Sequence, residues 1–209
     1  MTGREAVLAR IRAALVDRPQ ATGPAHAYRT AGELDATSVL ARFVERVRDY
    51  GAAVVVTDDP RAAAGDALTR EGARRVGIAA DLDAALRPDG PTLVEDVGLS
   101  ARALDELDGA LTTCAAACAE TGTIALDGCA GQGRRALSLV PDLHVCVVRA
   151  DRIVETIPEL VALLEPSARE GRPIVLVSGP SATSDIELNR VEGVHGPRRL
   201  VVVVARSAV

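Results

Sequence analysis

Lysine and tryptophan are absent from this chain of 209 residues, and only three of its residues are aromatic. All 24 basic side chains are therefore arginines. Schiff-base catalysis and the phosphate-binding P-loop each depend on a lysine, so the composition excludes both. The aromatic residues, Tyr28, Phe43 and Tyr50, are too few to form the stacking platforms on which proteins hold unpaired bases.

Charge and hydropathy exclude two further classes of partner. The formal net charge is −5, and no run of basic residues is longer than two. A nucleic-acid-binding protein needs a positive footprint, so we expect no nucleic-acid partner. No apolar stretch approaches the ~20 residues that a membrane-spanning helix needs. The N-terminus begins an amphipathic pattern instead of a signal peptide, and we expect a cytoplasmic protein without a membrane span.

The cysteines and histidines lack the spacing of a metal or cluster site. Cys114 and Cys118 are separated by three residues, which is not the spacing of a thioredoxin, zinc-ribbon or ferredoxin motif. Three of the four cysteines have apolar neighbours in the sequence, where reduced thiols are common. The three histidines form no His-x-His or His-Glu-x-x-His pair. We therefore expect no metal, iron–sulfur cluster or other cofactor bound by this chain.

The order of apolar and polar segments predicts an α/β fold. Strands and helices alternate over much of the chain, which favours a mostly parallel sheet with helices on both faces. The predicted strands are 52–57, 75–80, 92–95, 110–119, 121–126, 144–149, 174–177 and 200–204. The predicted helices include 2–16, 37–50, 60–72, 100–107 and 158–164. We expect two parts, an N-terminal helix with its linker over 1–34 and one α/β domain over 35–209. The linker could let the first helix lie on the main body or on a neighbouring subunit.

The stretch from 176 to 197 is the foremost site candidate. The apolar run 174–177 ends abruptly in Ser178 and Gly179, and a second tight turn at His195 and Gly196 precedes the strand 200–204. In open α/β sheets, ligands bind in loops at strand ends of this kind. Because a turn of this kind has no need for an imidazole in a core or capping role, His195 is the histidine that we single out. His144 is expected to begin a strand and to bond to a neighbouring loop.

Hydroxyl and acidic side chains fill the middle of this stretch. Ser184 and Glu187 have capping-box spacing, so a short helix is predicted to begin at Ser184. Its free N–H groups, together with the hydroxyls of Ser181 and Thr183, could hold a phosphate or carboxylate. The alternative is that these hydroxyls only cap the helix and satisfy the turn.

Two other places could carry chemistry. Gly131, Gln132 and Gly133 precede Arg134 and Arg135; glycines permit close backbone approach, and arginine can hold a carboxylate or phosphate with two hydrogen bonds. The alternative is a surface loop with solvated arginines.

The other place is Glu120, which lies between two apolar segments. If buried, it would have a raised pKa and could act as a base or nucleophile. The alternative is a glutamate bonded to backbone N–H groups at a bulge.

At these residues the chain resembles the LUD-domain family. Four motifs occur in that family's order: Ala119-Glu-Thr-Gly-Thr-Ile-Ala125; Gly131-Gln-Gly-Arg134 with Leu137-Ser-Leu-Val-Pro-Asp142; Ser178-Gly-Pro-Ser181 with Asp185-Ile-Glu187; and Gly193-Val-His-Gly-Pro197. The resemblance spans roughly 35–206, and 4–12 resembles the N-terminal helix of such proteins. In one departure, Ala182 stands where relatives often have a basic residue, which weakens the case for an anion at that loop.

The resemblance implies a fold related to the NagB/RpiA/CoA-transferase-like group, with the site at the strand ends. It also implies an accessory role in the oxidation of L-lactate to pyruvate, beside lactate utilization proteins A and B, which carry the iron–sulfur clusters. The loops at Glu120, at Gly131–Arg134 and at Ser178–His195 would then form one pocket for a small anionic metabolite. The alternatives are a stand-alone enzyme resembling CoA transferases or sugar-phosphate isomerases, with Glu120 as nucleophile or base, and a purely structural subunit.

These hypotheses define the expected site. The predicted catalytic residues are Glu120 and His195. The residues predicted to bind the ligand are Thr121, Gly122, Thr123, Gly131, Gln132, Gly133, Arg134, Ser178, Gly179, Ser181, Thr183, Ser184, Asp185, Glu187 and Gly196. No metal site is predicted.

Overall fold

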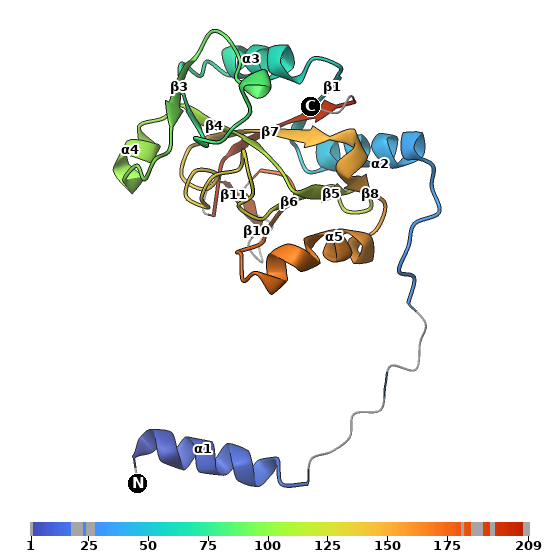
Figure 1. The fold of residues 1–209 in the computed structure, drawn as a ribbon, viewed down its shortest axis with the longest axis vertical. Helices are drawn as coiled ribbons and strands as arrows, with labels where there is room; N and C mark the ends of the chain where they lie inside the picture. Colours follow the sequence, from blue (N-terminus) through green and yellow to red (C-terminus); the bar gives the residue numbers. More distant parts are fainter. Residues whose placement is uncertain are drawn as a thin grey trace.

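The computed structural model describes residues 2–17, 23, 28–180, 182–184, 190–192 and 195–206. From residue 28 onward these residues form an α/β body built around two sheets, with helices packed on them (Figure 1). The α/β class expected from the sequence is confirmed. The division between residues 34 and 35 into two parts stays a prediction.

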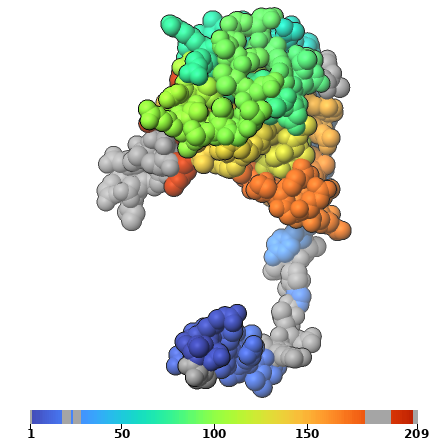
Figure 2. Space-filling model, turned by 60° about the vertical axis from the view of Figure 1, so that its left-hand side comes forward, coloured from blue at the N-terminus to red at the C-terminus, as the bar shows by residue number. Residues whose placement is uncertain are grey.

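The N-terminal helix α1 (Gly3–Ala14) begins where the sequence predicts it. Thr2 and Glu5 form a capping box, in which each side chain accepts a hydrogen bond from the backbone N–H of the other residue. No residue of α1 is buried, and its apolar side chains are exposed, Val7 by 56% and Ile11 by 49%. Figures 1 and 2 both show α1 apart from the α/β body. The helix therefore contributes no side chain to the core.

The main sheet has six parallel strands. Their order is β1 (Ala53–Thr57), β12 (Arg199–Ala205), β7 (Leu143–Arg149), β4 (Gly109–Thr113), β2 (Arg75–Ile78) and β3 (Thr92–Glu95). The central strands are nearly continuous apolar runs because both of their faces are covered. At the centre Val203 of β12 pairs with Val55 on one side and Val147 on the other. The mostly parallel sheet is confirmed.

One face of the main sheet is covered by helices. Helix α3 (Pro60–Arg70) begins with Asp59 as its cap and Pro60 in its first turn, and it packs Ala64 and Leu68 onto the sheet. The 3-10 turn η1 (Ala84–Leu86) packs beside it. Helix α4 (Ala101–Asp105) lies on the opposite face, where Leu104 is buried in a smaller cluster with Ala110 of β4, while the next residue, Leu111, faces α3.

The other face is covered partly by a helix and partly by a second sheet. Helix α2 (Ala36–Asp49) packs Phe43 and Val47 against residues of β7 and β12. The second sheet has the order β8 (Ile153–Val154), β5 (Ala116–Cys118), β6 (Thr123–Leu126) and β9 (Val175–Val177). The turn η2 (Ala150–Arg152) precedes β8, and helix α5 (Ile157–Arg169) covers the sheet's outer face.

The second sheet is the main difference from the sequence prediction. The segment predicted as one strand over 110–119 is divided, because the chain leaves the main sheet after Thr113 and enters the second sheet at Ala116. The helix predicted from Ser184 stays a prediction, because only its cap residue is among the described residues. Ala182–Ser184 forms strand β10, which pairs antiparallel with β11 (Arg190–Glu192). The segment 185–189 lies outside the described residues.

The strand order of the main sheet reverses between β2 and β4. After β2 the chain adds β3 on one side, whereas after β4 it adds β7 on the other. Ligand sites of open α/β sheets form beyond the carboxyl ends of the strands at such a reversal. This edge of the sheet is therefore one place to search for a site. None of the helices in the described ranges is long and apolar enough to cross a membrane.

Candidate functional site

Both turns of the C-terminal candidate stretch border one pocket of about 240 Å³. Ser178 and Gly179 follow β9, and His195 and Gly196 precede β12. The remaining lining residues are Arg135, Ser138, His144, Val175, Leu176, Val177, Pro180, Pro197 and Leu200. We call this cavity the Arg135 pocket. It lies at the carboxyl end of β9 and at the amino ends of β7 and β12, since His144 and Leu200 are the second residues of those strands.

His144 enters this pocket from the core. Its side chain is buried, and its Nε2 lies 2.8 Å from the Thr112 Oγ1 of the neighbouring strand β4. Burial, assisted by the nearby positive charge of Arg135, lowers the pKa of His144 to about 4. The imidazole is therefore neutral at pH 7. The sequence correctly places His144 at the start of a strand, but its partner lies in a strand and not in a loop.

Arg134 is held by an acidic partner. Its guanidinium makes two bonds to the Asp96 carboxylate, from Nε at 2.7 Å and from Nη2 at 2.9 Å, and it also donates to the Leu99 carbonyl. The Asp96 side chain is 1% exposed. Burial alone would raise the pKa of Asp96, but Arg134 and two backbone N–H groups outweigh it and lower that pKa. Arg134 therefore neutralises a buried acid, and it is not free to bind a ligand.

Arg135, the next residue, has no such partner. It donates to the Ser138 Oγ at 3.2 Å, and it makes no ion pair with any described residue. Burial lowers the pKa of Arg135, whereas the bond to Asp96 raises the pKa of Arg134. The sequence indicated the pair of arginines and predicted Arg134 as the binding residue. In the structure Arg134 is paired with Asp96, and Arg135 lines the pocket.

The glycine-rich loop before these arginines is braced internally. The buried Gln132 side chain accepts hydrogen bonds from the backbone N–H groups of Asp127 and Gly128 and donates to the Asp127 carboxylate. Gly131 and Gly133 both have a positive φ. A Cβ at Gly131 would lie 2.9 Å from the Thr113 Oγ1, and one at Gly133 would lie 2.9 Å from a methyl group of Leu137. The packing of the loop therefore explains why Gly131, Gln132 and Gly133 occupy these three positions.

The hydroxyls after Glu120 reach the Arg135 pocket through Ser178. Thr121 Oγ1 lies 2.7 Å from Thr123 Oγ1, which lies 2.8 Å from Ser178 Oγ.

Gly122, between these two threonines, lies close to helix α2. Its φ is +60°, and a Cβ there would lie 2.9 Å from the backbone of Arg46 in α2. Gly179 likewise passes close to Tyr50 at the end of α2. Both glycines let loops of the second sheet lie against that helix.

Glu120 itself is not buried and lines none of the pockets described. Its side chain is 44% exposed, and its Oε1 lies 3.0 Å from Nη2 of Arg29. The hypothesis that Glu120 is a buried carboxylate acting as a base or nucleophile therefore loses its basis, because the side chain is exposed. Among the described residues, Glu120 is bonded to an arginine and to no backbone N–H group, so the alternative of a bulge glutamate is also not seen there.

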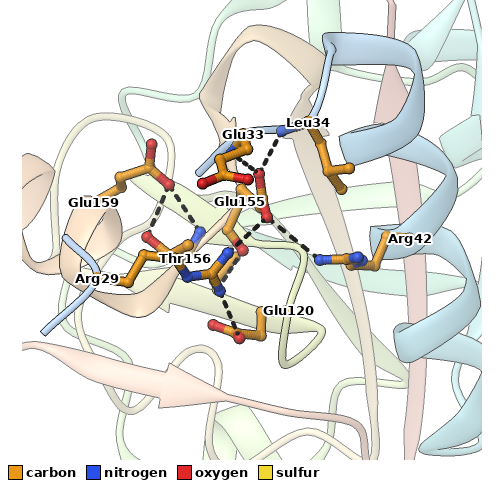
Figure 3. Close-up of polar contacts among 9 residues, drawn as sticks. Arg29, Glu33, Leu34, Arg42, Glu120, Glu155, Thr156 and Glu159 are labelled. Carbon is orange, nitrogen blue, oxygen red and sulfur yellow. Dashed lines mark hydrogen bonds and ion pairs between the residues drawn. The ribbon is translucent and has the colours of Figure 1, made fainter. Parts of the chain in front are cut away.

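Glu120 belongs to a polar cluster around Glu155, which the sequence did not single out (Figure 3). The buried Glu155 carboxylate accepts hydrogen bonds from the N–H groups of Glu33 at 2.6 Å and Leu34 at 2.7 Å. Arg29 and Arg42 lie 3.2 and 3.4 Å from its Oε1. The Leu34 N–H makes the largest contribution to lowering the pKa of Glu155, and it is assisted by Glu33 and Arg29. Glu155 therefore fastens the segment before α2 to the second sheet.

Several predicted site residues cannot be placed. Ser181, Asp185 and Glu187 lie outside the described residues. Thr183 and Ser184 belong to β10, and their side chains lie outside the described part.

A larger cavity of about 610 Å³ lies where the strand order reverses. Residues beyond the carboxyl ends of β2 and β4 line it, among them Asp81, Asp83 and Gly131. Most of its charged groups are compensated. Arg149 pairs with Asp151, Asp81 accepts a bond from the Gly131 N–H, and Arg172 binds Cys129 and lies 3.5 Å from the Asp127 carboxylate.

A third pocket of about 340 Å³ adjoins the Arg135 pocket. Gln132, Gly133 and Arg134 line it, and it shares Arg135, Ser138 and Val175 with the Arg135 pocket. The structure therefore brings the glycine-rich loop and the C-terminal turns to adjoining cavities, while Glu120 borders neither. No group of three or more His, Cys, Asp or Glu side chains in the described ranges could hold a metal ion.

Comparison with known proteins identifies the family. The family model described as LUD domain matches residues 88–205, which include every residue that lines the Arg135 pocket. The chain belongs to the LUD domain family. The resemblance seen in the sequence is confirmed.

Two relatives from Deinococcus radiodurans extend this result. Lactate utilization protein C of that organism is 48% identical to this LUD-domain chain over 194 residues, covering 92% of this chain and 90% of the relative. A crystal structure of a DUF162 family protein from the same organism superimposes with a TM-score of 0.72 and 41% identity, covering 83% of this chain and all of that one. Lactate utilization protein C of Bacillus pumilus is 39% identical over 90 residues, 41% of this chain and 37% of that protein.

Proposed function

We propose that this protein takes part in lactate utilization, as a cytoplasmic accessory component of a system that oxidises L-lactate to pyruvate. One observation carries the proposal. The chain is 48% identical to a lactate utilization protein C over nearly the full length of both chains. With identity of that extent over nearly the whole of both chains, a shared role is the simplest interpretation.

The oxidation of lactate to pyruvate releases two electrons and two protons, so the system needs an electron acceptor. An iron–sulfur cluster is held by a set of cysteine thiolates. The four cysteines of this chain form no group of three or more ligands among the described residues. This donor set does not fit a cluster. We therefore assign the iron–sulfur clusters to partner proteins resembling lactate utilization proteins A and B.

The role is tested by deleting the gene from its native host and measuring lactate-dependent reduction of an electron-accepting dye in extracts. Loss of that activity, restored by the full chain, is the expected result. A tagged copy is also expected to copurify with two iron–sulfur proteins from cells grown on lactate. If the deletion leaves dye reduction intact and the tagged chain copurifies with neither protein, the proposal is wrong.

The alternative of a stand-alone enzyme with Glu120 as nucleophile or base has less support. A general base or nucleophile functions at a site that holds the substrate. Glu120 is 44% exposed, is paired with Arg29 and borders no described pocket. Under the proposed role, Glu120→Gln leaves lactate-dependent dye reduction within about twofold of the parent, because it changes only a surface ion pair. A loss of acyl-transfer or isomerase activity in the purified variant would favour the alternative.

A further inference from the structure

The Arg135 pocket differs from the larger cavity in the balance of its charges. Its described lining residues include one arginine and two histidines, and none of them is an aspartate or glutamate. The larger cavity is lined by both acids and arginines, most of which pair with a neighbour. An arginine with no aspartate or glutamate among the described lining residues therefore distinguishes the smaller pocket.

Arg135 is this arginine. A guanidinium remains protonated at any pH that a protein tolerates, so it keeps its charge in the pocket. The side chain is half-buried, and its bond within the described structure is to the Ser138 hydroxyl. Removing a charge from water without an opposite charge nearby costs free energy. An anion placed beside Arg135 would recover that cost.

The other walls limit what this anion can be. The buried His144 is neutral at pH 7, so it adds no second cation. Ser178 is an exposed residue whose hydroxyl also bonds to Thr123, and Val175, Val177 and Leu200 form an apolar wall. The volume of about 240 Å³ is below the ~300–1,000 Å³ of pockets that bind drug-sized ligands. These features suit a compact ligand with one negative charge.

We propose that the Arg135 pocket is a binding site for a small monocarboxylate. The Arg135 guanidinium would hold the carboxylate with two parallel hydrogen bonds, the geometry in which arginine binds this group most strongly. The Ser178 hydroxyl would bond to a neighbouring oxygen of the ligand, and its short carbon chain would pack on Val177 and Leu200. This inference rests on the charge and shape of the pocket, and it does not depend on the proposed role in lactate utilization.

The test is isothermal titration calorimetry of the full chain with acetate, lactate, pyruvate and inorganic phosphate, at constant ionic strength. The variant Arg135→Gln removes the charge, and Arg135→Lys keeps the charge but not the planar fork. Arg70→Gln is the matched control, since Arg70 is an exposed arginine at the end of α3 with no ion pair among the described residues.

At least one carboxylate is expected to bind the parent chain and the Arg70→Gln variant equally. Its affinity should fall by about tenfold or more in Arg135→Gln, with Arg135→Lys between them. Arg135→Gln is expected to unfold at nearly the same denaturant concentration as the parent in anion-free buffer, because it breaks no ion pair and removes one hydrogen bond, to Ser138. That measurement separates loss of binding from loss of folding.

Three outcomes would overturn the inference. The parent chain could fail to bind any of the carboxylates at millimolar concentration, or Arg135→Gln could bind them as well as the parent. Phosphate could also bind through Arg135 while the carboxylates do not, which would make the site one for an inorganic oxoanion. None of these results bears on the deletion phenotype that tests the role in lactate utilization.

Discussion

Arg134 and Asp96 are 38 residues apart in the chain, and they form a two-bond pair whose acidic member is almost fully buried. Replacing Arg134 with Gln leaves this carboxylate with the N–H groups of Gly98 and Leu99. Leaving a buried charged group short of partners costs about 1–3 kcal/mol or more. We expect a loss at the lower end of this range, because Arg134 itself is 44% exposed and water screens part of the pair.

Urea unfolding of Arg134→Gln at pH 7 measures this loss. Arg102→Gln is a suitable control, because it removes an exposed pair with Glu106 one helical turn away. Such pairs contribute about 0.3–0.5 kcal/mol. Equal losses in the two variants would mean that the burial of Asp96 adds nothing to the pair.

His144 makes stability depend on pH. The unfolded chain binds a proton at this imidazole below about pH 6.5, whereas the folded protein binds it only near pH 4. Between these values the unfolded state binds more protons, so the free energy of unfolding falls as the pH is lowered. At pH 5 the loss amounts to roughly 2 kcal/mol, since each unit of pKa difference corresponds to about 1.4 kcal/mol.

The comparison of parent chain and His144→Gln at pH 7 and pH 5 isolates this contribution. The variant is expected to be less stable than the parent at pH 7, but to lose less stability on acidification. The aspartates and glutamates are the same in both proteins, so their contribution cancels when the two losses of stability are subtracted. The prediction fails if both proteins lose the same amount of stability between the two pH values.

At the residue scale, the sequence located the loops of the site but not the roles of the side chains in them. Two adjacent arginines cannot be told apart from sequence, because the difference depends on Asp96, which is distant in the chain. Gln132 had the residue type and neighbours of a ligand-binding group, yet its amide braces its own loop. The sequence did not indicate a role for Glu155, because its partners are distant in the chain: Glu33 lies in the linker and Arg42 in helix α2.

At the scale of elements, two glycines control how α2 lies on the second sheet. Gly122→Ala would place a Cβ 2.9 Å from the backbone of Arg46, and helix backbone cannot move aside cheaply. Gly171→Ala is the matched control, since its φ of +71° is similar but nothing lies within 4 Å. The control is expected to lose about 1–2 kcal/mol from the positive φ alone.

Gly122→Ala is expected to lose about 1–3 kcal/mol more than this control, the usual cost of overpacking a filled site. Thermal or urea unfolding of both variants measures the difference. If the two variants have the same stability, the contact between α2 and the Gly122 loop is not close in solution.

The Glu155 carboxylate is expected to protect two specific backbone amides. In Glu155→Ala the N–H groups of Glu33 and Leu34 lose their acceptor, and Arg29 loses one of its two partners. Hydrogen exchange of these amides should accelerate by about tenfold or more, since local opening governs exchange. Glu106→Ala, which removes an exposed glutamate, is the control. Unchanged exchange at residues 33 and 34 would show that Glu155 does not hold the segment.

The sequence predicted most strands of the main sheet and most of the helices that cover it, but it did not predict the second sheet. Alternation of strands and helices identified the parallel layer because each element carries its own periodicity. The segments Cys114–Ala119 and Ile124–Leu126 on either side of Glu120 are apolar, and such runs do not reveal which sheet a strand joins. The break between β4 and β5 depends on packing against α2 and α5, and these contacts come from residues distant in the chain.

At the scale of the whole molecule, α1 is separable from the α/β body. Because α1 buries no residue, removing residues 1–17 should change the free energy of unfolding by less than about 0.5 kcal/mol. Urea unfolding of the full and shortened chains measures this. A larger loss would mean that the helix packs on the body in solution. A smaller number of chains in the assembly after shortening would mean that the helix joins two copies.

Strand β12 lies inside the main sheet between β1 and β7, although its residues are translated after those of all the other described strands. Until Arg199–Ala205 has emerged from the ribosome, β1 has no strand beside it, and one side of β7 is open. Both strands are rich in valine and would expose unpaired edges in the nascent chain, the features that favour aggregation. During synthesis these two edges stay open to wrong pairing until β12 inserts between them.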